Sequence, residues 1–471
     1  MLFFIYDGIL GWDAKVVDGS SYEIGQLSGS GVMNKNGEAN LPDDSPWRAD
    51  LGEYMERITY NTTPANVTPA AVVDSYSPTA REINEADKLY SAGGTAPTVM
   101  ITPATLHDWV TGGSPASASA RAAGVYGYSK MVVLAVDSAG GYAAGHVPGA
   151  HLLDTASDLQ STRSDGVSDT VSQVATKAQM DALIQRTGID ADTLVVLTGG
   201  GSNMMNVGRA YFNFRYWGFP KKRLRVLNGT AATYQAAGYP LETAAPPAPA
   251  PSTYTVCSLP QDTSVRASLE EMIAVAEDSD DSTVVIDSRS ADEFNGVAGK
   301  TKVNTSTGTV VAFEGHVRTA VHQEWTTLVA PGGNGELLPV ADLEAAMSAI
   351  GVDASDTAYS YCRTSWRAAV TFLALDAALG WPAKIYDGAW IEWGQMADAA
   401  KMGGLAADSP WRTDTVLRSE AVNYNVDNAL TVEQLAGADS YAPQGDAIND
   451  YDSAVCTVGG GNGGGPPAPG Y

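Results

Sequence analysis

Short apolar runs alternate with longer amphipathic stretches in two parts of the chain. In residues 258–400 this pattern predicts helices at 268–277, 340–351 and 366–380 and strands at 283–287, 358–362 and 383–388. In residues 94–243 it predicts strands at 131–137, 194–197 and 224–229 and helices at 179–187 and 208–217. Short strands that alternate with helices of about 10–15 residues indicate a parallel sheet covered by helices on both faces. Each part is therefore expected to be an α/β domain.

Changes in composition divide the chain further. The stretch 244–257, AAPPAPAPSTYTVC, is rich in Pro and Ala and is typical of an extended linker. The stretch 459–471 is rich in Gly and Pro and predicts a low-complexity tail. The resulting segments are 1–93, 94–243, 244–257, 258–400, 401–458 and 459–471.

An internal repeat links the start of the chain to its end. IYDG occurs at 5–8 and 385–388, DSPWR at 44–48 and 408–412, and DSYSP at 74–78 is matched by DSYAP at 439–443. We therefore expect 1–93 to be the C-terminal half of a module plus its trailing segment, a repeat of 380–457. Either the natural protein is longer, or 1–93 is a free-standing half-module. In both cases another surface must cover its strand, and a protein partner could supply that cover.

The net charge of the chain indicates which classes of partner and which cellular location to expect. It has 54 acidic and 28 basic side chains and a formal net charge of −26. This disfavours nucleic acid and anionic membrane surfaces, because both attract positive charge. No apolar run reaches the roughly 18 residues of a membrane-spanning helix, so no membrane insertion is expected, and the first residues do not resemble a signal peptide. Such acidity is typical of proteins at a cell surface or in a periplasm, and we expect a periplasmic or extracellular location.

Cys362 lies where a predicted strand ends and a helix begins. In open α/β sheets, ligands bind at the carboxyl ends of the strands. A loop that enters a helix turns several backbone N–H groups toward one point and adds the positive end of the helix dipole. Arg363 and Arg367 add positive charge, and all of these features stabilise a thiolate. The sequence therefore predicts a reactive thiol.

Four motifs surround this thiol in a fixed order. They are VVIDSRSADEF at 284–294, EGHVRTAVHQEW at 314–325, CRTSWRA at 362–368 and KIYDGAWIEW at 384–393. Together they resemble the rhodanese-like sulfurtransferase family and cover most of 258–400. Residues 135–154, AVDSAGGYAAGHVPGAHLLD, resemble the same family, so the chain is similar to the tandem-domain thiosulfate sulfurtransferases. The resemblance implies an α/β fold of tandem rhodanese-like domains, each a parallel sheet with helices on both faces.

The resemblance also implies a function. Cys362 would take a sulfur atom from thiosulfate or a similar anionic donor, carry it as a persulfide, and pass it to a thiol or to cyanide. The residues implied in binding the donor are Arg363, Thr364, Ser365, Trp366, Arg367 and Arg289. Arg289 could instead form a structural ion pair, and Asp287 is expected to order the turn before it. No cofactor and no metal are expected, because the histidines show no spacing typical of ligands.

Two features of the loop bear on this interpretation. The family often has Gly at the fourth loop position, where this chain has Ser365, and a positive φ would be mildly unfavourable for Ser. A Cys-based phosphatase is the competing enzyme, because one branch of this fold hydrolyses phosphate esters. Those enzymes place an Arg six positions after the Cys, whereas here Arg367 comes five positions after it and Ala368 is sixth. The shorter loop favours sulfur.

The first α/β part cannot carry sulfur, because 94–243 contains no cysteine. Thr198 follows the strand whose counterpart precedes Cys362. By resemblance this part is expected to be an inactive domain that buttresses the active one. Its Gly199–Gly201 run could cradle an anion, although a structural loop is favoured.

The remaining signals are weaker. Cys257 and Cys456 both lie in flanks that look exposed, so they form either a disulfide or two unpaired thiols. His146 and His316, each preceded by Gly, are expected to make hydrogen bonds in the core. The alternative function is that of a structural component of a cell-surface or extracellular assembly with vestigial rhodanese activity, which the repeat, the acidity and the Gly-rich tail suggest.

Overall fold

The computed structural model describes residues 99–112, 128, 130–164, 169–201, 204–259, 262–277, 282–297, 303–304, 309–310, 313–394, 423–424 and 456. All of them belong to one compact unit of the chain, Ile83–Tyr471. The repeat segment 1–93 lies outside the described residues, so the half-module and the surface expected to cover it stay predictions. The tail 459–471 and most of the trailing segment 401–458 also lie outside the described residues.

The first half of the described chain is built on a five-stranded parallel sheet. Its spatial order is β1 (Met100–Ile101), β7 (Leu224–Thr230), β6 (Thr193–Gly199), β2 (Lys130–Asp137) and β3 (His151–Asp154). Helices of this half are α3 (Pro103–Gly112), α5 (Ala139–Ala144), α6 (Lys177–Arg186), α7 (Met204–Tyr216) and α8 (Ala231–Ala236). The central strand β6 is buried along its whole length, as expected of a strand with a neighbour on each side and helices on both faces.

The second half repeats this arrangement. Its sheet has the spatial order β13 (Val321–His322), β9 (Thr283–Asp287), β14 (Thr357–Tyr361), β15 (Ala383–Tyr386) and β8 (Arg266–Ala267). Its helices are α9 (Leu269–Glu277), α10 (Ala291–Phe294), α11 (Val340–Ser348), α12 (Ala368–Phe372), the π-helix η7 (Leu373–Leu379) and α13 (Ala389–Trp393). Numbered along the chain within each half, the strands of both sheets lie in the order 1-5-4-2-3. The predicted fold class, two α/β domains with parallel sheets, is confirmed.

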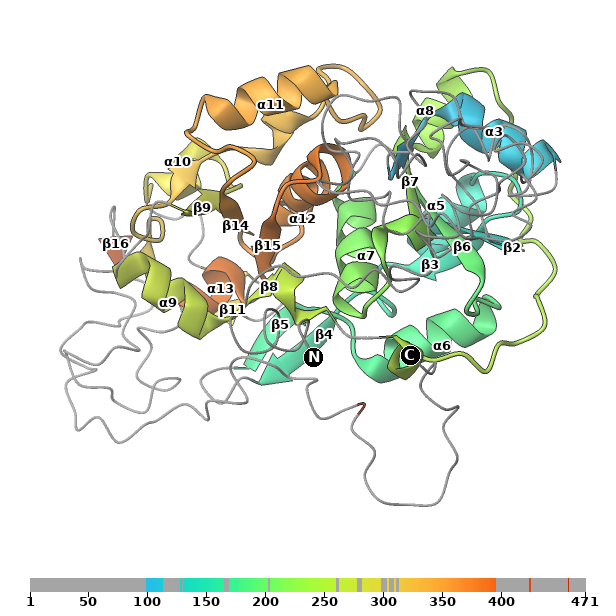
Figure 1. Ribbon diagram of the computed structural model, residues 1–471, viewed down its shortest axis with the longest axis horizontal. Coiled ribbons are helices and arrows are strands. Elements are labelled where there is room, and N and C mark those ends of the chain that lie inside the picture. The colour runs from blue at the N-terminus through green and yellow to red at the C-terminus, as the bar shows by residue number, and fades with distance from the viewer. Residues whose placement is uncertain are drawn as a thin grey trace, which may run out of the picture. The chain divides into compact units, whose positions relative to one another are not determined.

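Side-chain alternation along β6 shows how helices cover both faces of a sheet. Val195 and Leu197 pack in the cluster that contains residues of α6 and α7. Leu194 and Val196 point the other way, into the cluster formed with α3, α5 and α8. Successive side chains of a strand point to opposite faces, so one apolar run supplies both cores. Figure 1 shows α3 and α8 on one side of the first sheet and α6 on the other.

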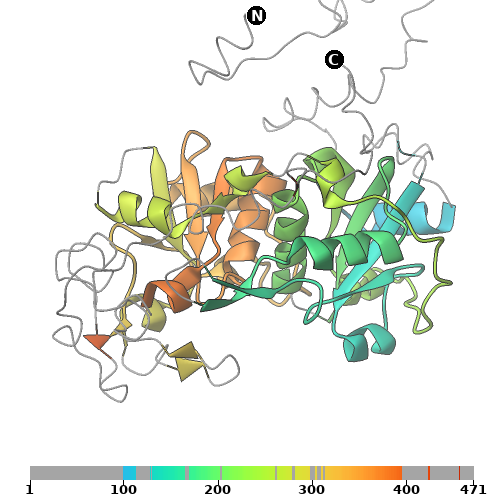
Figure 2. The same ribbon diagram turned by 90° about the horizontal axis from the view of Figure 1, so that it is seen from below.

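The two halves share one core. Helix α7 of the first half packs against α12 of the second, and both views show them side by side (Figures 1 and 2). Gly208 makes this approach close, because a Cβ atom at that position would lie 2.6 Å from the carbonyl oxygen of Ala369. Beyond this contact, the Tyr211 hydroxyl donates a 2.6 Å hydrogen bond to the carboxylate of Asp376. The first half is thus fixed directly to the helix that follows Cys362.

The remaining short elements lie outside the two five-stranded sheets. They are the antiparallel pairs β4 (Ser161–Ser164) with β5 (Asp169–Gln173), β10 (Val303–Asn304) with β11 (Thr309–Val310), and β12 (Phe313–Glu314) with β16 (Asn423–Tyr424), and the 3-10 helices η3 (Lys221–Arg223), η4 (Val256–Ser258), η5 (Thr263–Val265) and η6 (Trp325–Leu328). The β4–β5 hairpin belongs to the first half but reaches α13 of the second, where Thr170 donates to Glu392. Figure 2 shows this reach. The hairpin was not predicted from the sequence.

A disulfide joins Cys257 to Cys456, with 5.2 Å between their Cα atoms. The alternative of two unpaired thiols is therefore wrong, and Cys362 is the free cysteine of the chain.

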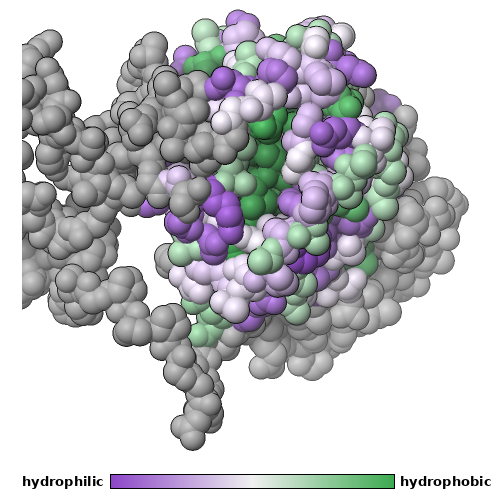
Figure 3. Space-filling model, turned by 90° about the vertical axis from the view of Figure 1, so that its right-hand side faces the viewer, coloured by the Kyte–Doolittle hydropathy of each residue, from purple (hydrophilic) through white to green (hydrophobic). Residues whose placement is uncertain are grey.

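Within the part of the chain that the structure describes, only Val297 and Val340 are large hydrophobic residues with exposed side chains. On the face seen in Figure 3, strongly hydrophobic residues are visible mainly inside one hollow. Among the described helices, none combines the length and apolar character that crossing a bilayer requires.

Candidate active site

Cys362 follows directly on β14, a strand that lies between β9 and β15 in the second sheet. Its residue is 1% exposed. The six residues from Cys362 to Arg367 form a loop that leads into α12, where the amides of Ala369 and Val370 donate to the carbonyl oxygens of Ser365 and Arg367 at 3.1 and 3.0 Å. The predicted arrangement of strand, cysteine loop and helix is confirmed. After α12 the helical path continues as η7 and ends at Gly380, which has φ 72° and so suits a residue without a Cβ atom.

The loop turns at Ser365, which has φ 64°. This is the left-handed conformation that the sequence predicted to be unfavourable for Ser. The Ser365 hydroxyl is placed within 2.9 Å of two carbonyl oxygens, those of Tyr386 and Asp387. A net hydrogen bond contributes about 0.5–1.5 kcal/mol, and left-handed backbone costs a non-glycine residue about 1–2 kcal/mol, so the side chain offsets the strain. Glycine could adopt the turn but could not make this bond.

Two further hydrogen bonds fix the loop to α13. The amide of Trp390 donates to the carbonyl oxygen of Cys362 at 2.9 Å, and the amide of Ile391 donates to that of Arg363 at 3.2 Å. Ala389, at the start of α13, also has a left-handed backbone with φ 56°. Cys362 is therefore held between its own strand and the helix that follows β15.

Arg289 lies two residues beyond the end of β9, the strand paired with β14, and is fully buried. Its guanidinium is ion-paired with the carboxylate of Asp287 at 2.6 Å and lies 4.3 Å from the ring centroid of Trp390. Asp287 also accepts from the Arg289 amide at 2.9 Å and from the Tyr361 hydroxyl at 2.7 Å. The structural ion pair is thus present, and Asp287 orders the turn as predicted. The Nη1 atom of Arg289 has no hydrogen-bond partner among the described residues, so it retains donors for a ligand.

Arg367 is held by Glu293 of α10. Its two terminal nitrogens donate to the two carboxylate oxygens at 2.6 and 2.8 Å. Glu293 itself belongs to a capping box with Ser290, which fixes the carboxylate at the start of α10. Burial alone would raise the pKa of Glu293, but the hydrogen bonds and charge of Arg367 outweigh it and lower that pKa to about 2. The pair is therefore ionised throughout the physiological pH range.

Positive charge exceeds negative charge around the thiol. The interacting charged side chains are those of Arg289, Arg363, Arg367, Asp287 and Glu293. Burial is the largest cause of a lowered pKa for Arg363, and the charges of Arg367 and Arg289 lower it further, against Glu293 and Cys362. Three cations facing two anions leave one positive charge for an anion at Cys362 to balance. Cys362 therefore lies in surroundings that hold more guanidinium groups than carboxylates.

The structure brings the predicted site residues together around one loop. Thr364 and Trp366 are half-buried, and Trp366 packs against the core shared by the two halves. The sequence reasoning missed Glu293, Asp387 and Trp390 as supports of the site. Glu293 carried a signal, because Ser-x-x-Glu is the pattern of a capping box, whereas the roles of Asp387 and Trp390 depend on contacts between distant segments.

In the first half, the loop that corresponds to the Cys362 loop differs in its residues and its surroundings. At the end of β6, a Cβ atom on Gly200 would lie 1.8 Å from a carboxylate oxygen of Asp137. A carboxylate therefore already lies against this glycine loop, and its negative charge would repel a bound anion. This favours the structural interpretation of Gly199–Gly201.

His146 and His316 also have the predicted core role, since each Nδ1 lies 2.8 Å from a backbone carbonyl oxygen. Within the described ranges, no group of His, Cys, Asp or Glu is arranged to hold a metal ion.

Comparison with known proteins finds relatives for much of the chain. A family model described as a Rhodanese-like domain matches residues 268–396. Sulfur carrier protein TtuD of Thermus thermophilus is 31% identical over 260 residues, which cover 54% of this chain and 84% of that protein. Thiosulfate sulfurtransferase of Corynebacterium glutamicum is 29% identical over 259 residues, which cover 54% of this chain and 79% of that protein.

A solved structure shows the same fold. An EanB variant in complex with ergothioneine matches with a TM-score of 0.50 and 18% sequence identity. The match covers 62% of this chain and 67% of the EanB chain. At this level of identity the likeness concerns the fold alone.

Proposed function

Because this chain belongs to the rhodanese-like family of sulfurtransferases, we propose that it moves a sulfane sulfur from thiosulfate or a similar small anionic donor to a thiophilic acceptor. The sulfur travels as a persulfide on Cys362. The relative named thiosulfate sulfurtransferase supports thiosulfate as the donor. The second half of the chain carries the reaction, since the first half lacks a cysteine.

In the first step the Cys362 thiolate attacks the outer sulfur of thiosulfate. A bond forms between the two sulfur atoms while the bond between the outer sulfur and the sulfonate breaks. Sulfite leaves with the electron pair of the broken bond, and Cys362 is left as a persulfide anion. Arg363 and Arg367 are the side chains proposed to bind the sulfonate oxygens, because guanidinium groups match such oxygens geometrically. Arg289 can add the unpaired Nη1 donor.

In the second step an acceptor such as cyanide or a thiolate attacks the terminal sulfur of the persulfide. The new bond takes the outer sulfur away, and the electrons of the S–S bond return to Cys362 as a thiolate. With cyanide the product is thiocyanate, and with a thiol it is a new persulfide. No cofactor and no external oxidant are needed to balance either step.

The observation that carries this proposal is the excess positive charge around a buried thiol. Cys362 is 1% exposed and lies among three arginines and two carboxylates. Burying charged groups costs desolvation free energy, and a neutral cysteine beside them would not compensate that cost. A thiolate, a persulfide anion or a bound anionic donor balances the charge. The geometry thus supports an anion at this position throughout the catalytic cycle.

A thiosulfate:cyanide assay tests the proposal. The intact chain should form thiocyanate from the two substrates, and Cys362→Ser should reduce the rate to background. The double variant Cys257→Ser/Cys456→Ser is the matched control, because it removes the other two cysteines of the chain and leaves the Cys362 loop intact. Equal rates for the native chain and Cys362→Ser would contradict the proposal.

We further propose that the protein works in a periplasmic or extracellular compartment. The Cys257–Cys456 disulfide supports this, because disulfides persist in oxidising compartments. Thiol trapping in the intact source cells, followed by mass spectrometry, should leave both cysteines unlabelled. Labelling of both would place the protein in a reducing compartment.

A further inference from the structure

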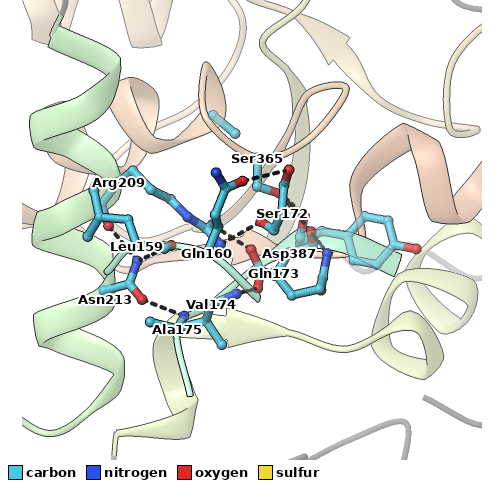
Figure 4. A network of polar contacts seen from close by, with 12 residues as sticks. Leu159, Gln160, Ser172, Gln173, Val174, Ala175, Arg209, Asn213, Ser365 and Asp387 are labelled. Carbon is cyan, nitrogen blue, oxygen red and sulfur yellow. Dashed lines mark hydrogen bonds and ion pairs between the residues drawn. The ribbon is translucent and has the colours of Figure 1, made fainter. Parts of the chain in front are cut away.

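Residue Asp387 is held almost entirely by the half of the molecule that has no cysteine. Its carboxylate is ion-paired with Arg209 of α7 at 2.5 Å, and both side chains are fully buried. The same carboxylate accepts from the amide of Val174 at 2.6 Å. Its backbone carbonyl oxygen accepts from the side-chain amide of Gln173, at the end of β5, at 2.8 Å. Figure 4 shows these groups converging on Asp387.

The catalytic loop depends on the same turn. The Ser365 hydroxyl contacts the Asp387 carbonyl oxygen that Gln173 also contacts, at 2.9 Å. Two residues after Asp387 the chain enters α13, where Trp390 donates its amide to the carbonyl oxygen of Cys362. The turn between β15 and α13 therefore makes hydrogen bonds both with the first half and with the loop that carries the thiol.

Unfavourable backbone conformations gather around this turn. Among the described residues, the non-glycine positions with positive φ are Ser172, Thr319, Ser365 and Ala389. All but Thr319 lie on this turn or in its partners. Arg209 donates to the carbonyl oxygen of Ser172 at 2.8 Å, and so stabilises the strained residue next to Gln173. Such conformations persist only where the surroundings hold them, and they are typical of functional sites.

The supports in the first half are themselves fixed. Asn213, one turn after Arg209 on α7, accepts from the amide of Ala175 at 2.7 Å and donates to the carbonyl oxygen of Leu159 at 3.3 Å. These bonds tie both ends of the β4–β5 hairpin to α7. Arg209 and Gln173 therefore belong to elements that are linked to each other, and a displacement of either would shift Asp387.

We propose that Arg209 and Gln173 are positioning residues for sulfur transfer, acting on Cys362 through Asp387 and the left-handed turn at Ser365. This inference rests on the proposed function of Cys362. Neither residue needs to touch the donor, because Gln173 holds the Asp387 carbonyl group that anchors the loop and Arg209 holds the carboxylate of the same residue. The half of the chain without a cysteine thus contributes directly to the geometry of the reaction.

The test uses the full chain with two readouts. One is the single-turnover rate at which thiosulfate converts Cys362 to the persulfide, and the other is its alkylation rate with iodoacetamide. The alkylation readout reports Cys362 alone, since the other cysteines form the disulfide. Gln173→Met removes the bond to the Asp387 carbonyl and should slow both rates about 10-fold, because a small misplacement of a reacting group is costly. Arg209→Met should slow them at least as much, and Arg209→Lys, which keeps the charge beside Asp387, should recover part of the loss.

Tyr211→Phe is the matched control. It removes a hydrogen bond between the same helix and the second half, to Asp376, without touching the loop or Asp387. It should lower the melting temperature while both rates stay unchanged. A second comparison places Gln173→Met in a Ser365→Gly background. There the hydroxyl contact with Asp387 is absent, so Gln173→Met should slow the reaction much less than it does in the native loop.

The outcomes of these measurements either support or overturn the positioning role of Arg209 and Gln173. Unchanged rates in folded Gln173→Met would overturn the positioning role, as would equal slowing by Tyr211→Phe or by Gln173→Met in both backgrounds. If the native chain alkylates but forms no persulfide with thiosulfate, the proposed donor is wrong, and the alkylation rates alone decide the positioning role. If Arg209→Met fails to fold, the Gln173 and Arg209→Lys variants still carry the test.

Discussion

The guanidinium of Arg367 and the carboxylate of Glu293 form a two-bonded ion pair at one side of the thiol loop. Arg367 is the last residue of that loop, and Glu293 lies in α10, which follows the strand paired with β14. Their side chains are 22% and 11% exposed, so water screens the pair only partly. The pair therefore links the loop to the neighbouring strand and sets part of the charge around Cys362.

This pair predicts a dependence of stability on acid. The folded-state pKa of Glu293 is about 2, below its usual value of 4.5. A lowered pKa stabilises the fold above the unfolded-state value, and that contribution of about 3 kcal/mol is lost as the pH falls from about 5 toward 2. Urea unfolding at several pH values should show a shallower loss for Glu293→Gln than for the native chain. Glu344→Gln, at an exposed position of α11, should behave like the native chain, and equal slopes for all three proteins would refute the prediction.

Replacement of Arg289 should show that its ion pair is structural. Arg289→Met leaves the buried Asp287 carboxylate without its cation, and breaking a buried pair costs about 3–5 kcal/mol of unfolding free energy. Lys130→Met breaks the pair with Asp190, whose side chains are 40% and 41% exposed, and should cost about 0–1 kcal/mol. Denaturant unfolding of both variants measures the difference. If the two losses are equal, burial does not strengthen the Arg289–Asp287 pair.

Gly208 should resist enlargement. A methyl group there would lie 2.6 Å from the Ala369 carbonyl oxygen, so Gly208→Ala must push α7 away from α12. Overpacking of this kind costs about 1–3 kcal/mol. Gly140→Ala is the control, since nothing lies within 4 Å of its added methyl group, and its stability should stay equal or rise. Thermal unfolding distinguishes the two, and a Gly208→Ala protein as stable as the native chain would mean that the helices can separate without loss.

The disulfide should contribute to stability through the length of chain it closes. Cys257 and Cys456 are 199 residues apart, so their link restricts the unfolded chain strongly. The double variant Cys257→Ser/Cys456→Ser should lose about 2–5 kcal/mol of unfolding free energy. A reducing agent should weaken the native chain by a similar amount and leave the double variant unaffected. An effect of the reductant on both proteins would point to another cause.

Local patterns were enough to predict the loop that carries Cys362. Cys362, its flanking arginines, the preceding strand and the following helix are contiguous in the sequence, so period and composition located them together. A positive φ at Ser365 entered the sequence analysis only as a condition, because the family often has Gly at that position. The sequence could not predict what offsets its cost, since the carbonyl groups of Tyr386 and Asp387 belong to another strand.

Contacts between the halves could not be predicted in this way. Arg209 and Asp387 are 178 residues apart, and neither lies in a pattern that points to the other. The β4–β5 hairpin was missed because its strands, STRS and DTVSQ, are short and polar and lack the apolar alternation of a buried strand. Its burial comes from the second half of the molecule. Sequence patterns thus identified each sheet, whereas the supports that pass between the sheets required the structure.

The most direct test of the central claim is the intact mass of the protein after a single exposure to thiosulfate. The native chain should gain the mass of one sulfur atom, peptide mapping should place that atom on Cys362, and cyanide should remove it with release of thiocyanate. Cys362→Ser should gain nothing. A native chain whose mass does not change, or a sulfur atom found on another residue, would contradict the assignment of Cys362 as the sulfur carrier.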